Sequence, residues 1–304
     1  MLGEQINEWP IDAYLQHHDV LEKPDGNFIV AVTNHSADTG LDFMIEMDRN
    51  SGEVIKEWDF REVLDVDRFD LFFHSYDWLH VNSIFYDEAD GGIIVSGRSQ
   101  GIFKVSENNE LLWILAPHQG WELAGRNGDG LDTRDYLLTA VNEIGQPFPE
   151  EIQQGSVDQN NFSWPWSQHA AMILPNGHIF CFDNGFKRNF MFDLDYSRAV
   201  EYKIDLDRKE VRQVWQYGKE RGVALQSINI SDVDYLPITK NRMMISGNIF
   251  FEGQRSGRMI EIAEGTQTVV FEAHIKFKDQ FSLGNSWQQQ DIIYRGERLT
   301  LYPN

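Results

Sequence analysis

The feature that most constrains the fold of this sequence is a repeat of four similar segments. They lie near residues 17–60, 77–121, 164–222 and 227–277. Within them apolar and polar residues alternate with a period of two, as in residues 45–48, which is typical of half-buried β-strands. A unit of about four short strands that recurs at roughly 60-residue intervals indicates the blades of a propeller. The sequence therefore predicts an all-β fold, a β-propeller.

Tight turns in the first three units support this interpretation. Each opening strand is followed by a turn dipeptide: Asp25-Gly26, Asp90-Gly91 and Asn176-Gly177. Such pairs supply the positive φ angles that short hairpins require. Helical periodicity is scarce, so we expect hairpins rather than helices to connect the strands.

The number of units predicts a single propeller domain over residues 1–304 that is incomplete. Four units and a strand segment near residues 290–301 leave the ring open if the fold has six blades. Open sheets expose unpaired edges. Either the chain is a truncated gene product, or a partner covers the gap, including a second copy in a homodimer.

A long insertion over residues 120–165 separates the second and third units and is rich in Gly, Asn, Asp, Gln and Pro. Loops of this length in compact domains are usually functional or disordered. We expect it to form a lid or rim over the mouth of the central channel.

The charge excludes several classes of partner. The chain has 48 acidic and 26 basic residues, a formal net charge of −22. Such a surface repels phosphate backbones and anionic lipids, so we expect no nucleic-acid partner and no membrane partner. An anionic substrate would need a local basic pocket that overcomes this field.

The ends and the cysteine content limit the possible locations and cofactors. The first ten residues have neither a basic n-region nor an apolar h-region, so no signal peptide is expected in the chain as written. The protein is then cytoplasmic, or its export signal lies upstream. Cys181 is the single cysteine, which excludes an intrachain disulfide and a cysteine-built metal site. Its apolar surroundings predict a buried, inert thiol.

Three histidines occupy equivalent places in the first three units. His18, His80 and His169 each stand eight to eleven residues before the turn glycine. The innermost strand of each blade lines the central channel, so the three imidazoles are predicted to point toward one axis.

Two kinds of site fit such a cluster. Three histidines could bind a metal, typically zinc with an open position. Alternatively, they could include a nucleophile and its acid/base partners. Asn82 is predicted to share a strand face with His80, and Arg98 follows the next strand. A guanidinium and a carboxamide suit a tetrahedral oxyanion better than a dication, so they favour the second kind and no metal.

Several stretches resemble the bacterial arylsulfotransferase family and keep that family's order. They are residues 79–83, 94–100, 112–115, 167–169, 182–185, 196–199 and 215–222. The resemblance extends from about residue 17 to residue 222 and is weaker in the fourth unit and the tail. It implies a six-bladed propeller with the active site in its central channel, and a periplasmic location.

The resemblance also implies an activity and roles for individual residues. Family members transfer a sulfuryl group from a phenolic sulfate ester to a phenol, without a nucleotide donor or other cofactor, by a ping-pong mechanism through a sulfohistidine. By motif, His169 matches the nucleophile. His80, Asn82 and Arg98 match the residues that hold the sulfuryl oxygens. His18 matches a further channel histidine through a weaker motif, and either His18 or His80 would be the acid/base.

Aromatic residues flank the histidine strands and could stack on an aryl substrate, Trp166 being the predicted contact, or could pack the blades.

Two other functions remain open. One is a non-catalytic propeller that binds sulfated or phenolic ligands or a partner protein. The other is a metal-dependent hydrolase or lyase that uses the three histidines.

Overall fold

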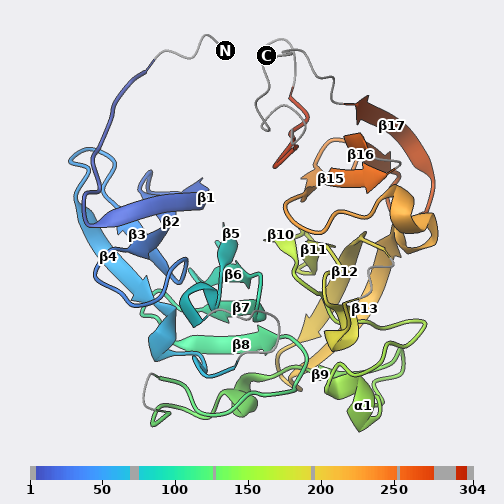
Figure 1. Cartoon of the computed structure of the whole chain (residues 1–304), viewed down its shortest axis with the longest axis horizontal. Helices are drawn as coiled ribbons and strands as arrows, with labels where there is room; N and C mark the ends of the chain where they lie inside the picture. Colours follow the sequence, from blue (N-terminus) through green and yellow to red (C-terminus); the bar gives the residue numbers. More distant parts are fainter. Residues whose placement is uncertain are drawn as a thin grey trace.

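The computed structural model describes residues 5–68, 75–125, 128–192, 196–251, 254–276 and 292–299. In this part of the chain the strands form four separate sheets, arranged as an arc of blades around a common centre (Figure 1). The predicted all-β propeller is confirmed.

The strands of each sheet follow one another in the sequence. The first sheet contains β1 (Tyr14–Glu22), β2 (Phe28–Asn34), β3 (Phe43–Met47) and β4 (Val54–Asp59). The second contains β5 (Val81–Tyr86), β6 (Ile93–Gly97), β7 (Gly101–Val105) and β8 (Leu111–Leu115). The third contains β10 (His169–Ile173), β11 (Ile179–Asp183), β12 (Arg198–Asp205), β13 (Glu210–Tyr217) and the short β9 (Thr139–Ala140). The fourth contains β14 (Asp232–Leu236), β15 (Asn241–Phe251), β16 (Gln254–Ile262) and β17 (Val269–Lys276).

Helical segments are short and lie in the connections. They are α1 (Glu150–Gln153), η1 (Phe60–Glu62), η2 (Ser75–Asp77), η3 (Thr133–Tyr136), η4 (Arg188–Phe190) and η5 (Lys219–Ala224). No helix of the described segments is long and apolar enough to cross a membrane.

The first strand of each sheet is the innermost one. β1 contacts β5, β5 contacts β10, and β10 contacts β14. The hairpin turns that lead outward from β1 and β10 contain Gly26 and Gly177, with φ of 90° and 80°, as the sequence predicted. The inner strands therefore meet at the centre of the arc, where the histidines were predicted to lie.

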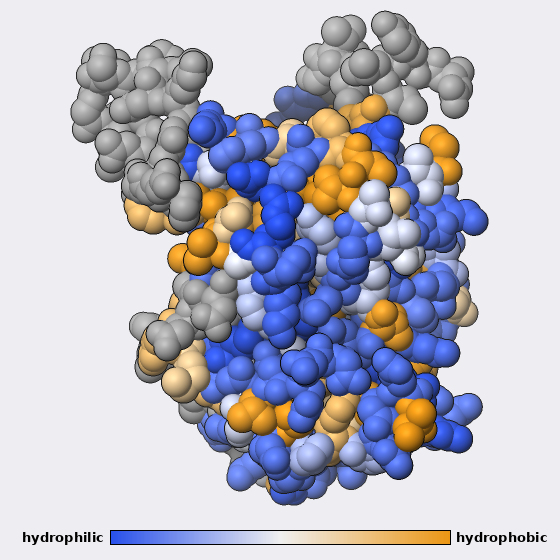
Figure 2. Space-filling model, turned by 90° about the vertical axis from the view of Figure 1, so that its right-hand side faces the viewer, coloured by the Kyte–Doolittle hydropathy of each residue, from blue (hydrophilic) through white to orange (hydrophobic). Residues whose placement is uncertain are grey.

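Apolar side chains between neighbouring sheets hold the arc together. Trp58 and Phe103 belong to the cluster between the first and second sheets, Trp113 and Tyr202 to the next cluster, and Phe180 to the third. Burial of this apolar surface is the main driving force for packing the blades on one another. The surface is different: the face in Figure 2 is mostly hydrophilic with scattered hydrophobic residues, as the net charge of −22 leads us to expect.

The insertion after the second unit does not form the predicted lid. Its strand β9 pairs in parallel with the outer strand β13, and Ile152, Phe162 and Trp164 are buried in the core cluster between the second and third sheets. In Figure 1, β9 and α1 lie on the outer side of the arc, away from β1, β5 and β10. The prediction is wrong for this part because the aromatic residues of the insertion are part of the core.

The predicted C-terminal strand segment is also corrected. Residues 292–299, the described part of that prediction, have no strand conformation. The Ile293 N–H donates to the Gly247 carbonyl at 2.9 Å, and Arg295 pairs with Asp19 at 2.7 Å. The segment thus connects the fourth sheet to the first, mainly through side chains rather than through a ladder of backbone hydrogen bonds.

Cys181 lies in β11 and is fully buried. Burial raises the pKa of its thiol well above the ordinary value. The predicted inert thiol is consistent with this environment, because a thiol with a raised pKa does not form the reactive thiolate.

The buried carboxyl of Asp42 gives a testable pH dependence of stability. Burial raises its pKa from 3.8 to about 7, so the folded state keeps a proton that the unfolded state loses. The stabilisation from Asp42 is complete below the pKa of its carboxyl in the unfolded state. It is lost as the pH rises through the pKa of this carboxyl in the folded state. We therefore expect the free energy of unfolding of Asp42→Asn, relative to that of wild type, to rise by on the order of 2 kcal/mol between pH ~5 and pH ~8. Urea unfolding at the two pH values measures this difference.

The control for this experiment is Glu88→Gln, which changes an exposed carboxyl. Its stability relative to wild type should change little over the same pH range. An Asp42→Asn difference that is the same at both pH values would contradict the assignment of a raised pKa to Asp42.

Candidate active site

The three predicted histidines converge where the inner strands meet. His18 is in β1, His80 directly precedes β5, and His169 is the first residue of β10. The Nε2 atoms of His18 and His80 are 3.1 Å apart. The ring of His169 lies edge-on to Tyr294, which in turn stacks on His18. One cluster therefore contains all three imidazoles.

Backbone irregularities at the inner strands set the directions of these side chains. His18 and His80 have positive φ angles of 50° and 58°, and Ala170, next to His169, has 54°. The strand pairing shifts register at His18, at Ala170 and, just after His80, between Val81 and Ser83, as in a β-bulge. Left-handed conformations are uncommon outside glycine, and bulges often re-aim side chains next to active sites. The same local device thus recurs in three blades.

Asn82 lies at the register shift between Val81 and Ser83. Its side chain is buried, and its Nδ2 donates to the Gln168 carbonyl at 2.7 Å. The carboxamide N–H is thus used to hold the chain next to His169. This bond uses one of the two N–H donors of the amide, so the predicted contact of Asn82 with a sulfuryl oxygen stays a prediction.

The imidazole of His169 is fixed in one tautomer. Its Nδ1 is 2.7 Å from the Asn184 Oδ1, and the Asn184 Nδ2 donates to the carbonyls of Ser227 and Ile230 at 2.7 and 2.9 Å. Because both carbonyls only accept, the amide must direct its oxygen to His169, so Nδ1 carries the proton. The lone pair of His169 therefore lies on Nε2.

Burial also keeps His169 neutral. Desolvation, with a smaller effect of the nearby Arg98, lowers the pKa of His169 from 6.5 to about 3. At neutral pH the Nε2 lone pair is available for nucleophilic attack, as the role predicted for His169 requires.

His80 and His18 belong to a directed chain of hydrogen bonds. The Asp77 carboxylate is 2.8 Å from the His80 Nδ1, and the Tyr294 hydroxyl is 2.8 Å from the His18 Nδ1. Burial tends to raise the pKa of Asp77, but the hydrogen bond with His80 brings it below the ordinary value, so this carboxylate accepts. Desolvation lowers the pKa of His18 to about 3, so His18 is neutral.

With His80 as the neutral imidazole, these states set the direction of the hydrogen bonds in the chain. The His80 Nδ1–H donates to Asp77, which leaves the His80 Nε2 to accept from the Nε2–H of His18. The remaining lone pair of His18 is on Nδ1, which accepts from the Tyr294 hydroxyl. A hydroxyl at this position can transfer its proton to His18, while His18 passes a proton on toward Asp77.

Two cationic side chains, Arg98 and Lys187, lie near the histidines. Arg98 directly follows β6, and its guanidinium carbon is 5.9 Å from the centre of the Phe186 ring; the Lys187 Nζ is also 5.9 Å from that centre. Burial, and then the proximity of Arg98, lowers the pKa of Lys187. Two cations that interact electrostatically favour the binding of an anion near them, which is the local positive charge that an anionic substrate requires.

Trp166 does not have the predicted place. Its side chain is fully buried in the cluster between the second and third sheets, and its ring lies edge-on to Phe190 at 5.0 Å. A ring that is enclosed by core residues cannot stack on a substrate, so the predicted aryl contact of Trp166 is corrected to blade packing.

Sequence reasoning missed four residues of the cluster. Asp77 stands three residues before His80, and Asn184 lies in the motif at residues 182–185, so both had a signal in the sequence. Lys187 follows the same motif. Tyr294 had no signal, because it comes from a segment without periodicity that is 276 residues from His18.

The described residues contain no group of three or more His, Cys, Asp or Glu side chains arranged to hold a metal ion.

The fold and the cluster together define a β-propeller with a histidine-centred cationic site at the inner ends of its blades. The chain belongs to the arylsulfotransferase family: the family model "Arylsulfotransferase (ASST)" matches residues 1–294.

Two curated relatives carry the name arylsulfate sulfotransferase AssT. The protein from Escherichia coli O6:H1 is 31% identical, and the alignment covers 85% of this chain and 50% of the relative. The protein from Lelliottia amnigena gives the same identity and coverage. The chain thus spans about half the length of the curated relatives it matches. Among solved structures, the Dos1 propeller is 8% identical, with a TM-score of 0.39, and covers 87% of this chain and 63% of that one.

The tautomer of His169 can be tested without an activity assay. We expect histidine ¹⁵N NMR to show a protonated Nδ1 and an unprotonated Nε2 on His169, with no protonation from pH ~8 down to pH ~5. Asn184→Ala removes the acceptor and should give a mixture of tautomers. Asn108→Ala, at an exposed loop position, is the control. A His169 that titrates near pH ~6.5 would contradict the argument from burial.

Proposed function

We propose that this chain is the catalytic propeller of an aryl sulfotransferase. It moves a sulfuryl group from a phenolic sulfate ester to a phenol in two half-reactions, through a sulfated His169. The observation that carries the proposal is the His169 ring, whose free Nε2 lone pair lies close to Arg98. Membership of the arylsulfotransferase family supports it.

In the first half-reaction the His169 Nε2 attacks sulfur, and the bond from sulfur to the phenolic oxygen breaks. The leaving phenolate takes a proton that the His18 Nδ1 has gained beforehand, from solvent in the first turnover and from the preceding acceptor phenol in later ones, because the resting His18 carries only a lone pair at this atom. Sulfuryl transfer resembles phosphoryl transfer in its loose, in-line transition state, so positioning and charge stabilisation dominate. Arg98 and Lys187 supply positive charge for the transferring oxygens.

In the second half-reaction an acceptor phenol donates its proton to the His18 Nδ1. Its oxygen attacks the sulfur, the bond between sulfur and the His169 Nε2 breaks, and His169 returns to its neutral form. The direction of the hydrogen bonds supports His18 as the acid/base in contact with the phenol, with His80 and Asp77 behind it. The two halves make a ping-pong mechanism.

The larger context of the chain is part of the same proposal. We take the four blades as one incomplete propeller domain, whose open side is covered by a partner or by a second copy in a homodimer. The phenolic donor, the phenol acceptor and a periplasmic location follow from the resemblance and are predictions for this chain.

The covalent intermediate gives the decisive test. Wild-type protein is mixed with an aryl sulfate and no acceptor, and peptides are analysed under conditions that preserve the N–S bond. We expect a sulfuryl group on His169, removal of that group by added phenol, and neither in His169→Asn. His178→Asn, which alters a histidine outside the cluster that pairs with Glu201, is the control. Absence of both adduct and released phenol would favour the alternative, a non-catalytic propeller that binds sulfated or phenolic ligands.

A second test addresses Arg98. Arg98→Lys keeps the charge but loses the planar fork that matches oxyanions. We expect kcat/KM for the aryl sulfate donor to fall by roughly tenfold to a hundredfold, because a transition-state contact is weakened. Arg49→Lys, which changes an exposed arginine, should have little effect. An unchanged kcat/KM in Arg98→Lys would contradict the role of the guanidinium.

A further inference from the structure

The protein places a phenol of its own in the histidine cluster. The Tyr294 hydroxyl is 2.8 Å from the His18 Nδ1, and its ring stacks on the His18 ring at 5.7 Å with an interplanar angle of 17°. The same ring lies edge-on to His169, with ring centres 6.5 Å apart. Tyr294 therefore lies between the proposed base and the proposed nucleophile, where the acceptor phenol of the second half-reaction has to lie.

The neighbouring residues hold Tyr294 in this place. On one side of it the Ile293 N–H donates to the Gly247 carbonyl; on the other, Arg295 pairs with the buried Asp19 at 2.7 Å. The Gly296 N–H donates to Asp232 at 3.2 Å. Contacts to both the first and the fourth blades thus fix the segment on either side of the phenol.

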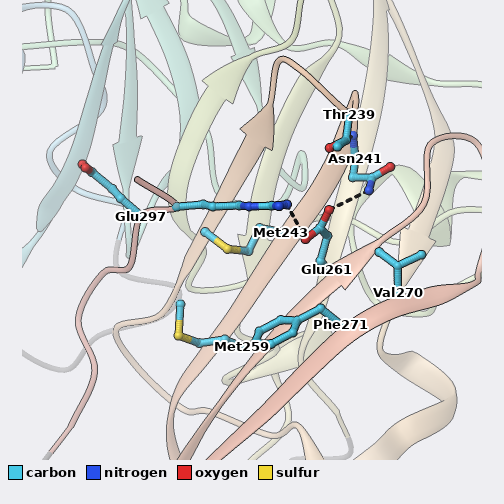
Figure 3. A pocket seen from close by; sticks show the side chains of 9 residues that line it. Thr239, Asn241, Met243, Met259, Glu261, Val270, Phe271 and Glu297 are labelled. Carbon is cyan, nitrogen blue, oxygen red and sulfur yellow. Dashed lines mark hydrogen bonds and ion pairs between the residues drawn. The ribbon is translucent and has the colours of Figure 1, made fainter. Parts of the chain in front are cut away.

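A second anchor lies further along the segment. Arg298 pairs with Glu261 of β16 at 2.8 Å, and Glu261 also accepts from Asn241 at 2.6 Å (Figure 3). Beside this ion pair, residues 297–298 and strands β15 to β17 enclose a pocket of about 540 Å³, with Met243, Met259 and Phe271 among its apolar lining. Residues 297–298 therefore line this pocket and tie the far end of the segment to the fourth blade.

We propose that Tyr294 is an intramolecular sulfuryl acceptor, a modification site at which the enzyme sulfates itself when no external phenol is present. This inference rests on the proposed function. Among the described tyrosines, Tyr294 is the one whose hydroxyl meets a site histidine. The product, a tyrosine O-sulfate, is itself a phenolic sulfate ester and so belongs to the donor class of the reaction.

The transfer step balances without any further reactant. The Tyr294 O–H gives its proton to the His18 Nδ1, and the phenolic oxygen forms a bond to the sulfur on the His169 Nε2. The N–S bond breaks, and its electron pair stays on His169, which becomes neutral. Reversal of the step returns the sulfuryl group to His169, so the modified tyrosine stores the group until an acceptor phenol enters.

The environment makes this acceptor a slow one. Burial raises the pKa of Tyr294 to about 12, so its proton is lost only through His18. External phenols with lower pKa values should compete effectively with it. Self-sulfation is therefore expected to follow, not replace, turnover with external acceptors.

The test follows the position of the sulfuryl group over time. The protein is mixed with 4-nitrophenyl sulfate and no acceptor, and peptides containing His169 and Tyr294 are quantified by mass spectrometry. We expect the group first on His169 and then on Tyr294, with less label on Tyr294 as phenol is added. In Tyr294→Phe the group should stay on His169. In Arg295→Ala, which releases the segment from Asp19, labelling of Tyr294 should slow several-fold.

The outcomes separate this inference from the proposed function. Label that stays on His169 in wild type overturns the self-sulfation of Tyr294 and leaves the sulfotransferase mechanism intact. No label on either residue overturns the proposed function itself. Tyr76, which is 49% exposed, is the internal control, and equal labelling of Tyr76 overturns the inference because the donor then reacts without the site.

Discussion

The site depends on one buried carboxylate, Asp183 at the end of β11. It is fully buried and pairs with Arg188 and Arg198 at 2.9 and 2.8 Å, and it also accepts from the N–H groups of Trp166 and Gly185 at 3.0 Å. A charge in this position is tolerated only when fully paired, and removal of one partner of such a pair typically costs about 3–5 kcal/mol. The interaction fixes the chain just before His169 and the loop that carries Asn184 and Lys187.

The same desolvation that makes Asp183 depend on its partners prepares the chemistry. Burial lowers the pKa of His169 and of His18, so both imidazoles are neutral at neutral pH and no base has to remove a proton from them first. It also lowers the pKa of the Arg98 guanidinium, which nevertheless stays cationic because its ordinary pKa is so high. A neutral nucleophile next to a permanent cation, in a low dielectric, is therefore a consequence of where the blades bury these residues.

The fold could be predicted largely from the sequence, because a period of two and Asp-Gly or Asn-Gly turns are local signals. The register shifts near His18, His80 and Ala170 could not, since an extra strand residue leaves no mark in a hydrophobic pattern. The position of Trp166 could not be predicted from local sequence patterns either. Only the packing of the insertion decides whether that ring faces the core or the channel.

The three histidines could be found from their common register, but their different roles could not. A common register predicts that the side chains point toward one axis, but it does not predict which residues contact each imidazole ring. His169 has a neutral amide behind it, which fixes a tautomer and adds no charge. His80 has the Asp77 carboxylate behind it, which accepts from the His80 Nδ1–H and leaves the His80 Nε2 facing His18. The division between a nucleophile and an acid/base pair thus arises from Asn184 and Asp77, residues that only the folded structure brings to the rings.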